Sequence, residues 1–200
     1  MPELLNVIGT LLLAIVGLYL THNFRRQIKQ KTADSRMDAY AALWAITELA
    51  RPTRLKGWKA ETLQGPLTRE EREELYTLLT HWYYHEGQGL YLGDTTRRIY
   101  LAAKNNLVCD EGDIEPKFLR DTLLALKTED ERHVMRGKWS IDQLSLLRAR
   151  MRADLEVYGP LFVGPLEPED KAFLEHCKED WRKPPWSPAR PRLKGWSLGQ

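Results

Sequence analysis

The feature that most constrains this chain is a run of 21 residues without a charge, Leu4 to Phe24, in which Leu, Ile and Val predominate. A helix rises about 1.5 Å per residue, so this run spans about 30 Å, the thickness of a bilayer's hydrocarbon core. It is too long and too uniformly apolar for a buried helix of a soluble domain. We therefore expect residues 1–24 to form a single transmembrane helix.

A cleaved signal peptide is the alternative interpretation. It needs a positive segment before a shorter apolar core, and a small-residue cleavage site after it. Here Met-Pro-Glu precedes the run, and the basic residues follow it, at 25, 26, 29, 31 and 36. This order favours an uncleaved anchor. The positive-inside rule then predicts a single pass through the cell membrane (a plasma or inner membrane), with the N-terminus outside and the bulk of the chain in the cytoplasm.

One face of the predicted anchor carries small and weakly polar residues. They are spaced four, four, three and four apart, and at 100° per residue they fall within about 80° of one another. The residues are Asn6, Thr10, Ala14, Gly17 and Thr21. Such a face lets two helices approach closely. It predicts helix pairing, with a second copy or with another membrane protein, although these residue types are also common in membrane helices generally.

The net charge of +2 hides a strong partition along the chain. Residues 24–60 carry a net charge of +6, residues 61–181 of −8, and residues 182–200 of +5. A basic segment beside an anionic leaflet gains about 1 kcal/mol per Lys or Arg. We therefore expect the anionic inner leaflet to be one partner. Nucleic acid is not expected, because the acidic middle segment opposes a polyanion.

The rest of the chain predicts an all-α fold. Residues 25–50 read as a juxtamembrane helix that ends before Arg51-Pro52, because the residue before proline avoids the α region. Residues 51–181 predict a cytoplasmic domain of about five or six helices, whose first part, 51–67, reads as a loop. Residues 182–200 contain four prolines and no helical period, and predict a disordered basic tail rich in Pro and Trp.

Local signals predict where the domain's helices begin and end. Thr68-x-x-Glu71 is a capping box, and Gly87 is a natural C′ residue for the helix that it opens. Asp94 or Thr95 is expected to cap the next helix, and Pro116 to begin another. Ser140-x-x-Gln143 reads as a second capping box, which separates a helix over 128–139 from the one that follows. Pro168 begins the last helix, with its Phe, Leu, Cys and Trp residues inward.

A basic and aromatic pentapeptide occurs twice, at 54–58 and at 192–196, as Arg-Leu-Lys-Gly-Trp. Trp rings and cations both favour the membrane interface, so the two copies predict contact with the leaflet. Two copies of a partner-binding peptide and chance recurrence are the alternatives. The residues predicted to lie at the membrane interface are Arg25, Arg26, Lys29, Lys31, Arg54, Lys56, Trp58, Arg192, Lys194 and Trp196.

The sequence contains no catalytic, cofactor or nucleic-acid signature. His81 and His85 have the spacing of two zinc ligands on a helix, but Glu86 follows them, where the metalloprotease motif has Glu after the first His. We therefore expect no cofactor and no metal site. The chain predicts a non-catalytic scaffold that localises a cytoplasmic protein partner at the membrane. The alternative is a membrane-tethered enzyme with a metal-dependent site at His81, His85 and Glu86.

Overall fold

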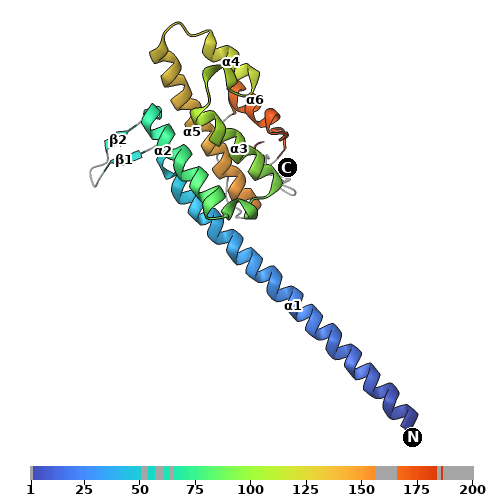
Figure 1. Cartoon of the computed structure of the whole chain (residues 1–200). Helices are drawn as coiled ribbons and strands as arrows, with labels where there is room; N and C mark the ends of the chain where they lie inside the picture. The colour runs from blue at the N-terminus through green and yellow to red at the C-terminus, as the bar shows by residue number, and fades with distance from the viewer. Residues whose placement is uncertain are drawn as a thin grey trace, which may run out of the picture. The chain divides into compact units, whose positions relative to one another are not determined.

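A computed structural model of the chain describes residues 2–50, 54–56, 61–63, 65–155, 166–183 and 186 (Figure 1). For residues 2–16, 49 and 50 and for the two strands, only the backbone is described. The chain divides into two compact units, Met1–Ala39 and Tyr40–Gln200. Each unit is described separately below.

Helix α1 spans Pro2–Ile46 and is followed by the 3-10 helix η1, Thr47–Ala50. The predicted juxtamembrane segment is thus helical as far as Ala50, and Arg51 and Pro52 lie outside the described residues. Every residue from 17 to 34 is exposed. Among the residues described, no helix combines the length and the apolar character needed to cross a membrane. The side chains of residues 4–16, which form most of the predicted anchor, lie outside the description.

Five further α-helices follow α1 in the described part of the chain, so the predicted all-α class and helix number are confirmed. They are α2 (Arg69–Thr80), α3 (Asp94–Val108), α4 (Lys117–Leu124), α5 (Glu129–Asp154) and α6 (Pro168–His176). Short helical turns connect them: η2 (His81–His85, a π-helix), η3 (Gln88–Tyr91) and η4 (Glu111–Asp113).

The core of the second unit lies where α2, α3 and α5 pack side by side (Figure 1). Each helix turns a stripe of apolar residues inward at a spacing of three or four. The fully buried members include Leu75, Leu79, Trp82, Ile99, Leu107, Leu144 and Leu147. The last part of α1 contributes Tyr40 and Leu43 to this unit. A smaller cluster of Ile114, Leu119, Leu123 and Trp139 is buried around α4.

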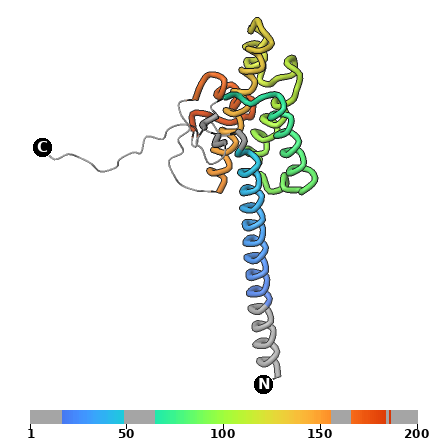
Figure 2. The backbone as a smooth tube through the Cα atoms, turned by 90° about the vertical axis from the view of Figure 1, so that its left-hand side faces the viewer, coloured from blue at the N-terminus to red at the C-terminus, as the bar shows by residue number. Residues whose placement is uncertain are grey.

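Helix α5 runs the length of the second unit (Figure 2), and the prediction of two helices separated at Ser140 is wrong. The Ser140 hydroxyl donates to the Arg136 carbonyl at 2.8 Å, within one continuous helix. The capping box that starts α5 is instead formed by Thr128 and Glu131. Polar side chains in the middle of a helix bond back to the preceding turn, so a capping pattern alone does not fix a helix start.

The start of α2 agrees with prediction, because Thr68 and Glu71 form both bonds of the capping box. Gly87 adopts a φ of 67°, the left-handed conformation expected of a C′ glycine. Two details differ. The segment 51–67 contains a two-stranded antiparallel hairpin, β1 (Arg54–Lys56) with β2 (Glu61–Leu63), where a loop was expected. Gly93, rather than Asp94 or Thr95, occupies the N-cap of α3.

The predicted disordered tail begins too early at residue 182. Trp186 is only 2% exposed, and its indole N–H donates to Glu179 Oε1 at 3.3 Å. The Trp186 backbone N–H donates to the Lys183 carbonyl at 3.1 Å. The packed part of the chain therefore extends to Trp186. The remainder of the predicted tail, 187–200, lies outside the described residues.

A polar network joins three helices and the segment after α6. Asp154, at the end of α5, accepts hydrogen bonds from the hydroxyls of Tyr40 and Thr96, and it pairs with Arg150 at 3.1 Å. Arg150 also pairs with Glu179 at 3.1 Å. The Asp154 side chain is only 9% exposed, so these bonds replace water around a carboxylate. The network fixes the registry of α1, α3 and α5.

Candidate functional site

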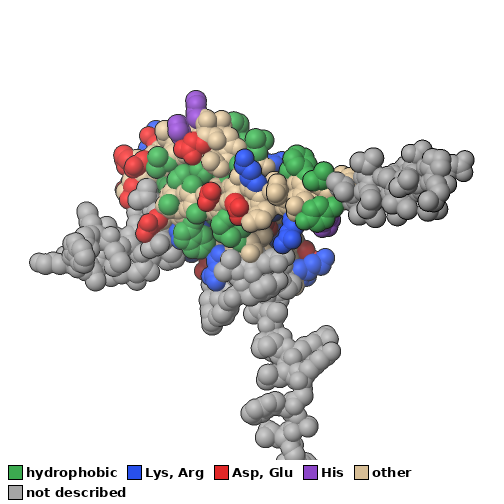
Figure 3. All heavy atoms as spheres, turned by 90° about the horizontal axis from the view of Figure 1, so that it is seen from below, with side chains coloured by type: hydrophobic (Ala, Val, Ile, Leu, Met, Phe, Trp, Pro, Cys, Tyr) green, Lys and Arg blue, Asp and Glu red, His purple; other side chains and the backbone are tan. Residues whose placement is uncertain are grey.

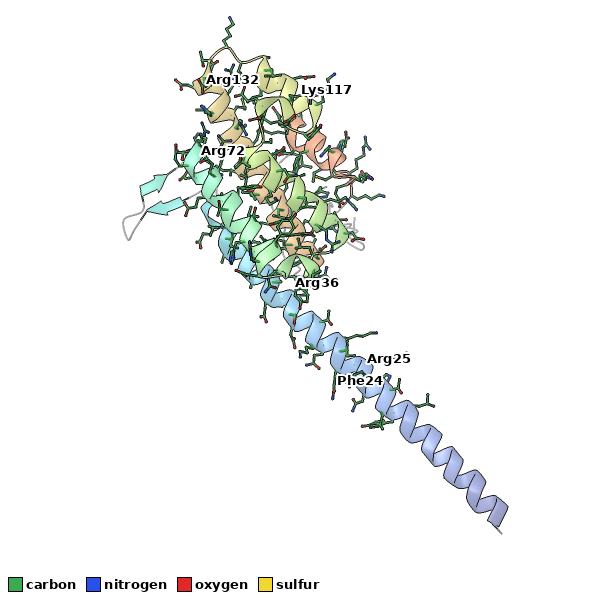
Figure 4. The ribbon with its side chains drawn as sticks, in the orientation of Figure 1. Phe24, Arg25, Arg36, Arg72, Lys117 and Arg132 are labelled. Atoms are coloured by element: carbon green, nitrogen blue, oxygen red, sulfur yellow. The ribbon has the colours of Figure 1, made fainter. Side chains whose placement is uncertain are left out.

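Of the residues predicted to contact the membrane, four lie on α1 with exposed side chains: Arg25, Arg26, Lys29 and Lys31. Figure 4 labels Phe24 and Arg25, where the apolar run gives way to basic residues. The other six are Arg54, Lys56, Trp58, Arg192, Lys194 and Trp196, whose side chains lie outside the described residues. The interface prediction thus stays a prediction.

Two residues of the predicted pairing face fall within the described side chains. The Thr21 hydroxyl donates to the Gly17 carbonyl at 2.8 Å, within its own helix. A Cβ placed on Gly17 would meet nothing within 4 Å. The hydroxyl proton is thus used internally, and an oxygen lone pair stays open to a donor from another helix. Asn6, Thr10 and Ala14 lie outside the described side chains.

His81 and His85 stack against each other, with ring centroids 5.2 Å apart. Nδ1 of His81 lies 3.2 Å from Glu86 Oε1, and both side chains are exposed. Histidine side chains also project at one edge of the face in Figure 3. Within the residues that the structure describes, no three His, Cys, Asp or Glu side chains are arranged to hold a metal ion.

A pocket of about 170 Å³ lies where α2, the C-terminal end of α3 and α5 meet. We call it the arginine pocket, because Arg72 from α2 and Arg136 from α5 both line it. Leu107 and Cys109 at the end of α3 contribute to its wall. Figure 4 labels Arg72 on α2, together with Arg132 on α5.

Arg72 is 2% exposed, which is unusual for an arginine. Its guanidinium donates to the Leu107 carbonyl at 3.0 Å, and its Nε–H has no partner among the described residues. Burial, and then the positive charge of Arg136, lower the pKa of Arg72 to about 10. The protein therefore holds a buried cation that forms no ion pair with a carboxylate among the described residues, although the charge of Glu73 acts on it from the same pocket.

Arg136 also donates to a carbonyl at the end of α3. Its guanidinium donates to the Cys109 carbonyl at 2.6 Å, and its Nε–H is also buried without a partner in the described structure. Both arginines thus bind carbonyls at the C-terminal end of α3, where the helix dipole carries partial negative charge. That interaction satisfies only part of each guanidinium, which has five N–H donors.

Acidic residues at the rim of the arginine pocket are paired with other cations. Arg69 pairs with Glu73 at 2.9 Å, and Arg132 pairs with Glu111 at 3.1 Å. These pairs neutralise one another at the surface. The uncompensated positive charge lies deeper, at Arg72 and Arg136.

Sequence reasoning missed both arginines of the pocket. Neither residue belongs to any of the motifs considered above. The spacing of Arg72 to Leu75 and Leu79 nevertheless places it on the buried stripe of α2, three and seven residues before them. A charged residue on an apolar stripe was therefore the available signal.

A second group of titratable residues lies between α5 and α6. Burial, and then the negative charge of Asp170, raise the pKa of Asp142 to about 6. Burial also raises the pKa of Asp170, although its carboxylate accepts the Glu167 backbone N–H at 3.1 Å. Lys138 pairs with Glu167 at 3.1 Å beside them.

This carboxylate pair predicts a pH-dependent stability. The folded state holds the Asp142 proton more tightly than the unfolded state, so this residue stabilises the fold at low pH. The stabilisation is lost as pH rises from about 4 to about 6. Asp142→Asn should therefore raise the free energy of unfolding at pH 7.5 by about 1–2 kcal/mol, after allowance for solvent screening.

The measurement is urea unfolding of the full chain in nonionic detergent between pH 4 and 8. The substitution should have little effect at the acid end of that range, where Asp142 itself is protonated in the folded state. Exposed Asp113 provides the matched control, and Asp113→Asn should change stability little at either pH. Equal gains for Asp142→Asn at pH 4.5 and 7.5 would contradict the assignment.

Comparison of the chain with protein-family models, with curated proteins and with solved structures finds no match.

Proposed function

We propose that this chain is a single-pass membrane protein whose helical domain is a non-catalytic binding module, held at the inner face of the cell membrane. The observation that carries the anchor is the exposure of α1. Leu18, Tyr19 and Leu20 are between 60% and 73% exposed, and Phe24 is 64% exposed. Consecutive residues of a helix point 100° apart, so apolar side chains face outward in several directions at once.

Cover on all sides is what a bilayer provides. A single protein partner covers one stripe of a helix, whereas lipid surrounds it. In the sequence, the uncharged run that ends at Phe24 begins at Leu4, and its length is suitable for a bilayer. The basic residues after Phe24 support a cytoplasmic position for the domain, under the positive-inside rule.

The binding-module part of the proposal is supported by the surface of the second unit. Several large apolar side chains are exposed there: Leu78, Tyr84, Leu90, Phe118, Leu124 and Val134. The segment that contains them carries a net charge of −8 over residues 61–181. We propose that a cytoplasmic protein binds this unit and is thereby kept near the anionic leaflet, while the exposed cations of α1 contact the lipid.

The anchor is tested by alkaline extraction of membranes from cells that express the full chain. The full chain should stay in the membrane pellet and dissolve in nonionic detergent, whereas a chain lacking residues 1–24 should appear in the supernatant. Detergent solubility separates insertion from aggregation. A matched control replaces Leu12 and Ile15 by Arg in the full chain. Each Arg adds about 2.5–3.5 kcal/mol to the free energy of membrane insertion at a helix centre, so alkali should extract a substantial part of this variant.

Release of the full chain by alkali would remove the anchor from the proposal. The binding module is tested separately, by cross-linking in native membranes before purification in mild detergent. A stoichiometric second protein would support it. Recovery of self-linked species alone would instead favour pairing through the Asn6–Thr21 face.

A further inference from the structure

We propose that the arginine pocket binds a small oxyanion, of the carboxylate or phosphate class, between Arg72 and Arg136. This inference does not depend on the membrane anchor. It starts from an imbalance of charge: the guanidinium groups of Arg72, which is buried, and of Arg136, which is half-buried, line one pocket, and within the described part of the chain neither forms an ion pair with a carboxylate. Buried charges in proteins are normally paired, because an unpaired one loses its hydration without compensation.

The geometry suits an oxyanion. Arg presents a planar fork of N–H donors, which matches carboxylate and phosphate oxygens, and two such groups can enclose one anion. The pocket volume of about 170 Å³ corresponds to roughly six water molecules at about 30 Å³ each. That space accommodates an anion of four or five heavy atoms together with some water. The lower pKa of Arg72 shows the same uncompensated charge, which an anion would relieve.

The rim limits the class of ligand. Glu73, Asp110 and Glu111 line the pocket. Glu73 and Glu111 are balanced by Arg69 and Arg132, so Asp110 is the rim carboxylate that repels a ligand with several negative charges. Polyphosphates and nucleic acids are therefore disfavoured. A mono- or dianion that passes between these carboxylates reaches the two arginines, and Leu107 and Val108 offer its apolar part a wall.

The competing explanation is that both arginines only cap α3. The chain contains an arginine that does this elsewhere: Arg98 Nε donates to the Cys177 carbonyl at the end of α6, at 2.9 Å. Arg98 is exposed, so water completes its hydration. Arg72 has no such access. Arg98 is therefore a matched control, since its substitution removes a helix cap without touching the pocket.

The experiment uses the full chain in nonionic detergent with two probes, inorganic phosphate and acetate, each against chloride at equal ionic strength. Either probe should raise the unfolding temperature in a saturable way, as expected of a ligand that binds only the folded state. Arg136→Gln should weaken the apparent affinity at least tenfold, whereas Arg98→Gln should change it less than twofold. Arg136→Lys, which keeps the charge and loses the fork, should fall between them.

The alkylation rate of Cys109 provides a second measurement of anion binding, and it needs no substitution. Cys109 lines the arginine pocket and is partly exposed, whereas Cys177 is buried. A bound anion should slow alkylation of Cys109 by iodoacetamide at least fivefold at saturation, relative to chloride.

Each outcome has a definite meaning. A saturable rise in unfolding temperature with phosphate alone assigns a tetrahedral dianion to the pocket. The same rise with acetate alone assigns a carboxylate, and both results support the proposal. If a probe raised the unfolding temperature of Arg136→Gln as much as that of the wild type, the proposal would be overturned. It would also be overturned if neither probe changed the unfolding temperature or the rate of Cys109 alkylation. The arginines would then be structural caps of α3.

Discussion

Asp154→Ala is expected to reduce the free energy of unfolding of the full chain in detergent by about 3–5 kcal/mol, the range for breaking a buried charge pair from one side. The carboxylate accepts hydroxyl protons from Tyr40 and Thr96 and pairs with Arg150. Alanine leaves these three groups without that acceptor in a site that water reaches poorly. The loss exceeds the value of the bonds themselves, because the desolvation cost of the two hydroxyls remains, while Arg150 keeps its ion pair with Glu179.

Urea unfolding measures this effect, and Asp121→Ala is the control. Asp121 lies on α4 with a side chain that is 58% exposed, and its nearest cation is 4.0 Å away, so its removal should cost under about 0.5 kcal/mol. A double-mutant cycle with Tyr40→Phe should give a coupling energy of about 0.5–3 kcal/mol. Independent, additive effects of Asp154→Ala and Tyr40→Phe would show that the two side chains do not share a network.

The helices that the sequence predicted correctly are those whose signals are local. Thr68 and Glu71 lie three residues apart, and their capping box needs no tertiary contact. Gly87 ends its helix because it adopts a left-handed backbone at no steric cost. The stripe through Ile99, Ala103 and Leu107 has the same local character, because its residues recur at a spacing of four, and all three are buried.

The errors share one cause, which is that the deciding contact comes from elsewhere in the chain. Ser140 has the pattern of a helix start, yet the packing of α5 against its neighbours keeps the helix continuous. Trp186 follows two prolines in a basic segment and reads as a tail, but Glu179 accepts its indole N–H. Local composition does not report such partners.

The candidate site was missed for a related reason. Arg72 and Arg136 belong to different helices, and the fold brings both to the end of α3, where each binds a carbonyl. Pattern reading finds motifs that are close in sequence, such as His81 with His85. These stack at the surface instead of converging on a pocket. A buried position occupied by arginine is the feature that a sequence can reveal, and its partner requires the fold.

The second large effect is expected at Gly137, in the middle of α5. Replacing an interior helix glycine by alanine normally stabilises a helix by about 1 kcal/mol. Here the added Cβ would lie 2.3 Å from the Leu67 carbonyl oxygen and 2.7 Å from the Leu67 nitrogen. Both are backbone atoms, so relief requires the segment before α2 to move. We expect Gly137→Ala to destabilise the fold by about 2–3 kcal/mol, within the range for overpacking.

Gly112 provides the control for Gly137, because a Cβ there meets nothing within 4 Å and the backbone is not left-handed. Gly112→Ala should change the free energy of unfolding by no more than about 0.5 kcal/mol. Chemical unfolding of both variants in the same detergent measures the two changes in the free energy of unfolding. A stabilised Gly137→Ala variant would mean that residues 66 and 67 do not pack on α5. A destabilised one would explain why glycine is placed where helix propensity opposes it: the chain enters α2 across the surface of α5, and only a residue without a side chain leaves room for that crossing.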